Sequence, residues 1–148
     1  MKSKFLVLLI LIIIAGCTPT KSSYYSNINK EHKIIALPAS NEYVSKFLKD
    51  AFRKNGWKVI LAKTSTTKIT GSTGKDTSLL KSLNKNVRYE AVLRQAYIDG
   101  CINFTHLVFF DLTIVDIKNG EQVFASTGQD CMSKIEKDLT RDLAKFFN

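Results

Sequence analysis

The apolar positions of this chain first follow a strand, helix, strand pattern. Residues 33–39 (KIIALPA) form a short apolar run ended by Pro38, which predicts a buried strand. Apolar side chains then recur at helical spacing, with Ser40 as the predicted cap, at Val44, Phe47, Leu48, Ala51 and Phe52. Asn55-Gly56 ends this helix, because glycine accepts the left-handed conformation of a C-terminal cap. Residues 57–62 (WKVILA) predict a second strand, so the three elements form a βαβ unit with parallel strands.

From Val87 the period changes to two, which is typical of half-buried strands. Residues 87–99 place Val92 and Ile98 on one face of a strand, and residues 105–117 alternate in the same way. Asn119-Gly120 then predicts a type I′ hairpin turn into residues 121–127. This part of the chain therefore predicts a three-stranded antiparallel meander.

The chain ends in a helical pattern. Ser133 and Glu136 have the spacing of a capping box. One apolar stripe follows, at Ile135, Leu139, Leu143 and Phe146. This helix can cover the same sheet face as the first one, so we expect an α/β fold (an α+β two-layer sandwich) in which both helices pack on one mixed sheet.

Two segments lack an apolar period. The polar residues that follow Cys17, up to His32, predict a flexible tether over 17–32, and the single globular α/β domain is expected over 33–148. In residues 63–78 nine of the sixteen residues are Ser or Thr, which predicts a loop that can serve as a contact surface. Its GSTGKD stretch has the wrong glycine spacing for a phosphate-binding loop. A short helix is expected over 77–86.

The first residues look like an export signal. Lys2 and Lys4 precede a twelve-residue apolar stretch over 5–16. As a helix this stretch reaches only about 18 Å, against a hydrocarbon core of about 30 Å. It is therefore too short for a comfortable membrane span.

The stretch Ile14-Ala15-Gly16-Cys17 matches the lipobox at every position, so the N-terminus resembles a bacterial lipoprotein signal. The resemblance implies removal of residues 1–16 by cleavage between Gly16 and Cys17, with diacylglyceryl and N-acyl (palmitate-type) groups on Cys17. Thr18 in place of Asp favours the outer membrane, facing the periplasm. The alternatives are an ordinary signal peptide and a short membrane anchor with an incidental cysteine.

Charge limits the partners. The chain has 22 basic and 13 acidic residues, and loss of Lys2 and Lys4 leaves a net charge of +7. Such a surface attracts anionic lipid, lipopolysaccharide or acidic proteins. Nucleic acid is not expected, because an exported, lipid-anchored protein rarely meets it. The basic residues are dispersed, which favours a solvated surface over a dedicated basic site.

Cys101 and Cys131 remain after the lipobox cysteine. In an oxidising compartment an even pair suggests a disulfide, and two free thiols are the alternative. The meander places both residues at one sheet edge, two strands or about 10 Å apart. That is too far for a bridge within the ladder, but the chain can bend inward beyond the strands. A disulfide is thus feasible, and it would add roughly 3–4 kcal/mol in the chain-entropy model.

Catalytic chemistry has little support. His32 falls in the tether, and His106 begins a strand with no evident Asp or Cys partner. Asp99 and Asp116 fall at strand ends, where they serve turns, and Asp111 lies within a strand. No hydrolase, metalloprotease or C-x-x-C motif occurs, so we expect no catalytic residue, no metal and no cofactor.

Three phrases carry a second resemblance: IIALP, LKDAFRKNGWKVI and LTIVDIKNGEQVFASTGQ. Together with the element order, they resemble small periplasmic domains of the kind found in the penicillin-binding-protein activator LpoB, the N-terminal domain of TolB and the core of the curli secretion protein CsgG. The resemblance covers about residues 33–148 and implies a non-enzymatic domain that binds protein partners.

The sequence therefore predicts a membrane-anchored lipoprotein, a non-catalytic accessory or regulatory module of a cell-envelope assembly. Its envelope protein partner would contact the exposed sheet face or residues 63–78. The alternative is a binder of an anionic envelope component such as lipopolysaccharide or glycan.

Overall fold

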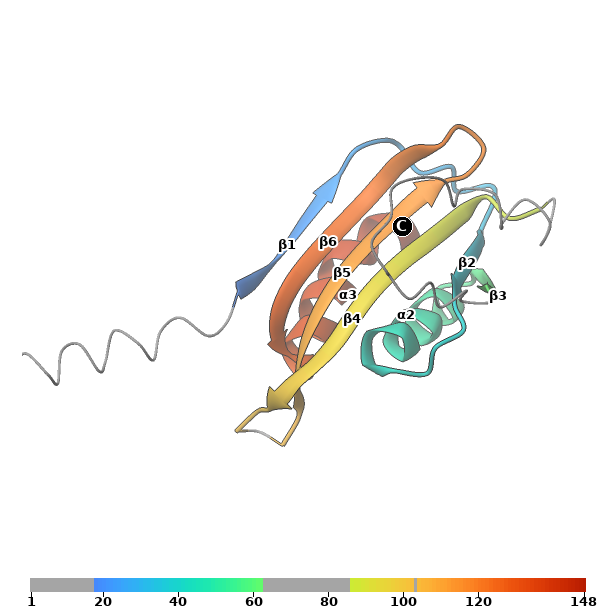
Figure 1. The fold of residues 1–148 in the computed structure, drawn as a ribbon. Helices are drawn as coiled ribbons and strands as arrows, with labels where there is room; N and C mark the ends of the chain where they lie inside the picture. The colour runs from blue at the N-terminus through green and yellow to red at the C-terminus, as the bar shows by residue number, and fades with distance from the viewer. Residues whose placement is uncertain (1–17, 63–85, 103) are drawn as a thin grey trace, which may run out of the picture.

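One mixed sheet organises the protein. The computed structural model describes residues 18–62, 86–102 and 104–148. In these residues the strands lie in the order β1-β6-β5-β4-β2-β3, and helices α2 and α3 pack against them (Figure 1). The elements are β1 Thr18–Tyr24, β2 Ile34–Pro38, α2 Tyr43–Lys54, β3 Lys58–Ala62, β4 Tyr89–Gly100, β5 His106–Asp116, β6 Glu121–Cys131 and α3 Met132–Phe147. The predicted α/β sandwich with one mixed sheet is confirmed.

The βαβ unit is formed by β2, α2 and β3. Strands β2 and β3 are parallel, with Ile35 opposite Val59 and Leu37 opposite Leu61. Helix α2 turns its apolar stripe to the core, where Val44, Leu48 and Phe52 are fully buried. The helix thereby covers the strands that it connects.

Helix α2 ends as predicted but begins differently. Gly56 has φ +77° and donates its N–H to the carbonyl of Arg53 at 3.0 Å, as in a left-handed C-terminal cap. At the other end the cap position is held by Glu42, not by Ser40, and Glu42 makes no side-chain cap bond. Ser40 lies two residues earlier, and its Oγ accepts the Glu42 N–H at 3.1 Å. The predicted Ser40 cap is therefore wrong.

The predicted meander is confirmed as β4, β5 and β6, with antiparallel pairing throughout. Its side chains alternate between the two faces, as the period of two requires. On β5 the core-facing side chains are all fully buried: Val108, Phe110, Leu112 and Ile114. On β4 Tyr89 is buried, whereas Val92 and Ile98 are exposed.

The β5–β6 connection differs from the predicted type I′ turn. Strand β5 ends at Asp116 and β6 begins at Glu121, so four residues form the loop. Among the described residues in this loop only Gly120 has positive φ (+75°), whereas a type I′ turn requires it at Asn119 too. The carbonyl of Asp116 accepts the Gly120 N–H at 2.8 Å, and its carboxylate accepts the Lys118 N–H at 3.0 Å. Because these bonds to Asp116 hold residues 117–120 outside the β5–β6 ladder, the connection is a four-residue loop and not a two-residue turn.

Helix α3 carries the predicted apolar stripe, and all four of its predicted residues are fully buried. The predicted capping box is wrong. Strand β6 continues to Cys131, which pairs with Leu107, and the helix begins at the next residue, Met132. Ser133 consequently lies inside the first helical turn and not at the cap position.

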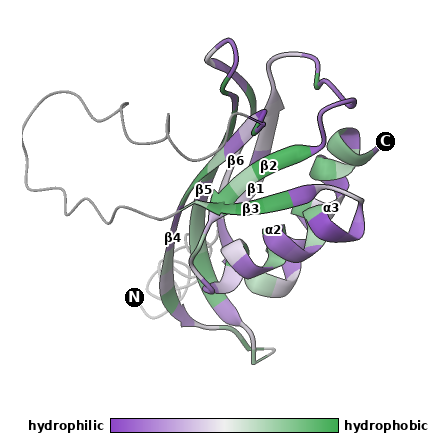
Figure 2. Ribbon diagram, turned by 90° about the vertical axis from the view of Figure 1, so that its right-hand side faces the viewer, coloured by the Kyte–Doolittle hydropathy of each residue, from purple (hydrophilic) through white to green (hydrophobic). Residues whose placement is uncertain are grey.

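Both helices cover the same side of the sheet, as predicted (Figure 2). They meet through aromatic side chains, and the ring centres of Phe52 and Phe146 are 6.0 Å apart in an edge-on arrangement. Phe146 also lies 5.8 Å from Phe124 of β6. The core therefore consists of one apolar layer between two helices and one sheet face.

The predicted tether is wrong for Thr18–Tyr24. These residues form edge strand β1, which pairs antiparallel with β6, for instance Tyr24 with Phe124. An edge strand needs only one weakly buried face, so no apolar period marks it in the sequence. Burial still alternates along it, with Thr20, Ser22 and Tyr24 partly covered and the residues between them exposed. The folded domain thus includes residues before position 33.

Gly128 of β6 makes room for β1. A Cβ atom built at this position would lie 2.9 Å from Thr20 Cα and 3.3 Å from Phe110 Cε1. Real Cβ atoms do not approach backbone so closely, and the pairing of β1 is already irregular between Thr18 and Lys21. The strand therefore approaches β6 only because position 128 lacks a side chain.

We expect Gly128→Ala to push β1 away from β6 and to lower the free energy of unfolding by about 1–3 kcal/mol, as for other overpacked sites. Urea unfolding measures the loss, and hydrogen exchange at the amides of Lys21–Tyr24 locates it. Gly100→Ala is the matched control, because a Cβ there meets nothing within 4 Å. Equal stability of the two variants would show that β1 does not depend on Gly128.

Candidate functional site

Cys101 and Cys131 form a disulfide, with Cα atoms 6.0 Å apart. The pairing that the sequence left open is thus settled. Strand β4 changes register between Tyr97 and Asp99, and Cys101 follows the strand, so the chain bends past the start of β5. The bridge joins the end of β4 to the end of β6 across the strand between them.

His106 lies in an aromatic group at this end of the sheet. Its ring centre is 4.6 Å from that of Tyr43 and 5.4 Å from that of Tyr97. Neither neighbour is a carboxylate or thiol that could orient the imidazole for proton transfer. In the described part of the chain, no three His, Cys, Asp or Glu side chains gather where they could hold a metal ion.

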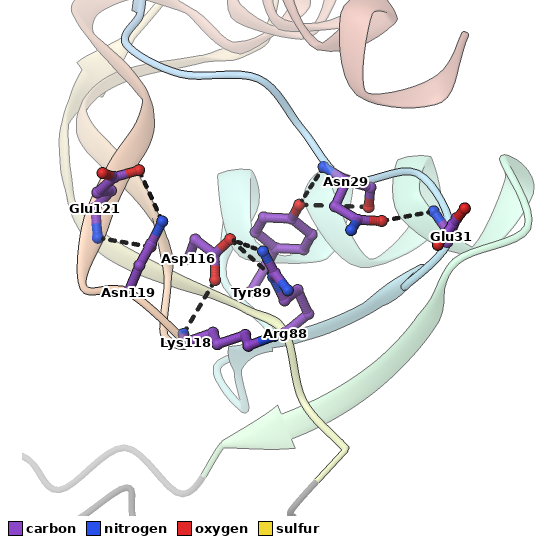
Figure 3. Close-up of polar contacts among 8 residues, drawn as sticks. All are labelled: Asn29, Glu31, Arg88, Tyr89, Asp116, Lys118, Asn119 and Glu121. Atoms are coloured by element: carbon purple, nitrogen blue, oxygen red, sulfur yellow. Dashed lines mark hydrogen bonds and ion pairs between the residues drawn. The ribbon is translucent and has the colours of Figure 1, made fainter.

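The carboxylates predicted to serve turns do so. Asp116 is buried and accepts from Arg88 Nη2 at 2.6 Å and from the Lys118 N–H (Figure 3). The Asp99 carboxylate accepts the Gly100 N–H at 2.7 Å. Both groups are used by the fold, and the buried Asp116–Arg88 pair fixes the loop that follows β5.

A second polar group joins the N-terminal segment to the sheet. The hydroxyl of Tyr89 accepts the Asn29 N–H at 2.6 Å and lies 3.3 Å from its carbonyl oxygen (Figure 3). Burial raises the pKa of this phenol, and a nearby Asp116 charge acts in the same direction. Tyr89 therefore stays neutral and serves as a structural hydrogen-bonding group.

Asp142 of α3 anchors β1 to the helix layer. The Ser22 hydroxyl donates to its Oδ2 at 2.6 Å and shares a second hydrogen bond of 2.8 Å with Ser126. Burial raises the pKa of Asp142 and is the largest single influence on that pKa. The hydrogen bonds from Arg141 and Ser22 and the charges of Arg141 and Lys145 together outweigh it, so the pKa of Asp142 is lowered. No local sequence pattern marks this contact, because Ser22 and Asp142 lie more than a hundred positions apart.

The candidate binding surface is the sheet side opposite the helices, here called the open face. It is formed by Val92 and Arg94 of β4 with Phe109 and Asp111 of β5, which alternate with core-facing residues. Val92 is 51% exposed and Phe109 is 38% exposed. Figure 2 shows α2 and α3 on the other side of the sheet, so no described helix covers these side chains. Large apolar side chains exposed on a sheet face that no described helix covers mark a candidate interaction site.

Charge lies at the centre of the open face. Arg94 stands directly opposite Asp111 across the β4–β5 ladder, between Val92 on one side and Phe109 on the other. The arrangement offers a partner one donor and one acceptor of opposite charge between two apolar contacts. Such a pattern fixes the orientation of a bound protein.

Several predicted features lie outside the described residues. These are Gly16, Cys17, the 63–78 loop and most of the helix expected over 77–86. Within the described ranges no helix is long and apolar enough to cross a membrane. The exposed sheet face is the predicted contact surface that the structure does describe.

No family model matches the chain, and neither does any curated protein. The fold is similar to that of solved PelC dodecamers from Paraburkholderia phytofirmans. In one crystal form the TM-score is 0.53 at 13% identity, over 87% of this chain and 96% of PelC. A PelC variant in another crystal form gives the same TM-score and identity, over 88% and 98%. At this identity the likeness shows a shared fold, and the predicted likeness to LpoB, TolB and CsgG domains stays a prediction.

We expect Asp142 to make the protein sensitive to acid. Because its folded-state pKa is lowered, its contribution to stability is complete above the unfolded-state pKa, near 4. The contribution is lost as the pH falls from there through the folded-state pKa. Asp142→Asn should lower stability at neutral pH. It should also reduce the loss of stability that the parent protein shows as the pH falls. Thermal unfolding from pH 7 downward measures this.

The matched control for this profile is Asp50→Asn, which changes an exposed carboxylate on α2. This variant should lose stability at low pH to the same extent as the parent protein. A profile for Asp142→Asn that parallels the parent at every pH would contradict the role given to Asp142.

Proposed function

We propose that this protein is a lipid-anchored, non-catalytic module of the bacterial cell envelope that binds a protein partner through its open face. The observation that carries the proposal is the exposure of Val92 and Phe109 on either side of the Arg94–Asp111 pair. The lipobox residues Gly16 and Cys17 supply the anchor in this proposal.

The non-catalytic part of the proposal is supported by how the candidate groups are used. Asp116 binds Arg88, Asp142 binds Ser22, and His106 packs against two tyrosines in tilted and edge-on arrangements. Each of these contacts stabilises the fold. The cysteines that remain after the lipobox are paired with each other, which leaves neither as a nucleophile.

The form of the open face supports a protein partner. It offers a partner apolar side chains, which contribute affinity, and two opposite charges, which fix the orientation of the bound protein. Binding through such a face tolerates salt better than binding to an anionic surface by dispersed lysines. The PelC structures are dodecamers, so self-association is one outcome that the experiment must separate from a different partner.

We expect the double variant Val92→Ser, Phe109→Ser to lose its partner in cells. Full burial of each side chain contributes about 1.5–3 kcal/mol, so capture should fall by about tenfold or more. In-cell crosslinking of the full-length protein, affinity purification and mass spectrometry measure the capture. Ile117→Ser is the matched control, because Ile117 is 43% exposed but lies in the β5–β6 loop.

Unchanged capture by the double variant, with an unchanged melting temperature, would rule out the open face as the contact. Capture of tagged copies of the same chain would identify a homo-oligomer instead. Recovery of lipopolysaccharide or glycan that is lost at high salt would favour the binder of an anionic envelope component.

The anchor is tested separately. We expect Cys17→Ala to abolish incorporation of labelled fatty acid and to leave an unprocessed precursor, because the thiol is the acylated group. Metabolic labelling and immunoblotting of membrane fractions measure both effects. Normal processing without a lipid label would indicate an ordinary signal peptide.

A further inference from the structure

We propose that Ile102 and Phe104, at the end of the β4–β5 hairpin, lie against the lipid bilayer and form a second membrane contact beside the N-terminal anchor. This inference rests on the lipid anchor of the proposed function. Ile102 and Phe104 have relative exposures of 102% and 100%, the highest among the large hydrophobic side chains of the described residues. A soluble domain gains nothing from holding two such side chains in water.

The hairpin end and the N-terminus lie at the same end of the sheet. Thr18 pairs with Gln129 near the end of β6, and Cys131 pairs with Leu107 at the start of β5. Figure 1 shows the start of β1 and the end of β4 at this same end. Thr18, the residue that follows Cys17 in the sequence, therefore lies at the end of the sheet that carries Ile102 and Phe104.

The hairpin end is held in place by the disulfide. Cys101 is bonded to Cys131, its N–H donates to the Thr105 carbonyl at 2.7 Å, and its carbonyl accepts the Phe104 N–H at 3.0 Å. Phe104 has φ +60°, a left-handed conformation that a phenylalanine adopts at a cost. Costly backbone conformations are concentrated at functional sites, and a preformed end loses little entropy on contact.

The chemistry of the hairpin end favours lipid tails over headgroups. No Lys or Arg occurs from Gln95 to Ile117, and the one carboxylate near the tip, Asp99, accepts the Gly100 N–H at 2.7 Å. The hairpin end therefore offers no cation to the headgroup phosphates, and a contact through Ile102 and Phe104 should not be weakened by salt. Tyr97, which is 55% exposed, stands behind the end, where an amphipathic ring suits the membrane interface. A second copy of the chain is a poorer occupant. Its two side chains would bury at most about 500 Å² on each copy, below the roughly 800 Å² per partner of a standard stable interface.

The test uses the full-length, processed protein in vesicles of phosphatidylethanolamine and phosphatidylglycerol with brominated acyl chains. Phe104→Trp places a reporter at the hairpin end, and Ile102→Trp reports independently, from a backbone position without positive φ. Ile117→Trp is the matched control at the opposite end of the sheet. Trp57 is 3% exposed and contributes the same background to all three.

We expect both hairpin reporters to shift to shorter emission wavelength and to be quenched several-fold more strongly than Ile117→Trp, at low and high salt alike. Equal quenching at the three positions, in protein that floats with the vesicles, would overturn the inference and leave the anchor intact. A wavelength shift without quenching would assign the hairpin end to a protein contact, which also overturns it. Protein that does not float at all would refute the anchor and the inference together.

Discussion

The structure depends on a single buried tyrosine where its two halves meet. Tyr89 begins β4 and pairs with Ile35, so it joins the parallel βαβ unit to the antiparallel meander. Its ring lies 5.7 Å from Trp57, the residue before β3, and 6.3 Å from Phe146 of α3. Its hydroxyl binds the backbone of Asn29, so the N-terminal segment is fixed to the same point. Loss of this side chain would leave both an apolar cavity and an unpaired backbone N–H.

Elements with a strong apolar period could be predicted from the sequence, because burial on one face imposes that period. This accounts for α2, α3 and the three meander strands, and the structure buries one alternating face of β5 and the predicted apolar stripe of α3. Strand β1 could not be predicted in this way. Its stability comes from pairing with β6 and from the space at Gly128, and neither leaves a local pattern.

Local turn and cap signals were less reliable than the apolar period, because distant contacts override them. The type I′ prediction at Asn119-Gly120 failed because Asp116 binds both Arg88 and the Lys118 N–H, which fixes a four-residue loop instead. The disulfide was predictable only as feasible, because ideal strand spacing gives about 10 Å and the register shift near Tyr97 supplies the bend. Within the open face, the position of Val92 could be predicted from the alternation of apolar and polar residues along β4. The hydrophobic pair at the hairpin end lies between strands, where no period marks it.

The early start of β1 has a consequence for the range of action of the domain. Thr18, the residue next to Cys17, already belongs to the sheet, and one residue of chain spans at most about 3.6 Å. With a lipid on Cys17, almost no flexible linker would separate the domain from the membrane. The domain could then not extend into the periplasm to reach a partner. The height of the open face above the bilayer would then vary little. A partner would have to reach it by lateral diffusion, and the local concentration of membrane-bound partners, more than intrinsic affinity, would then control occupancy.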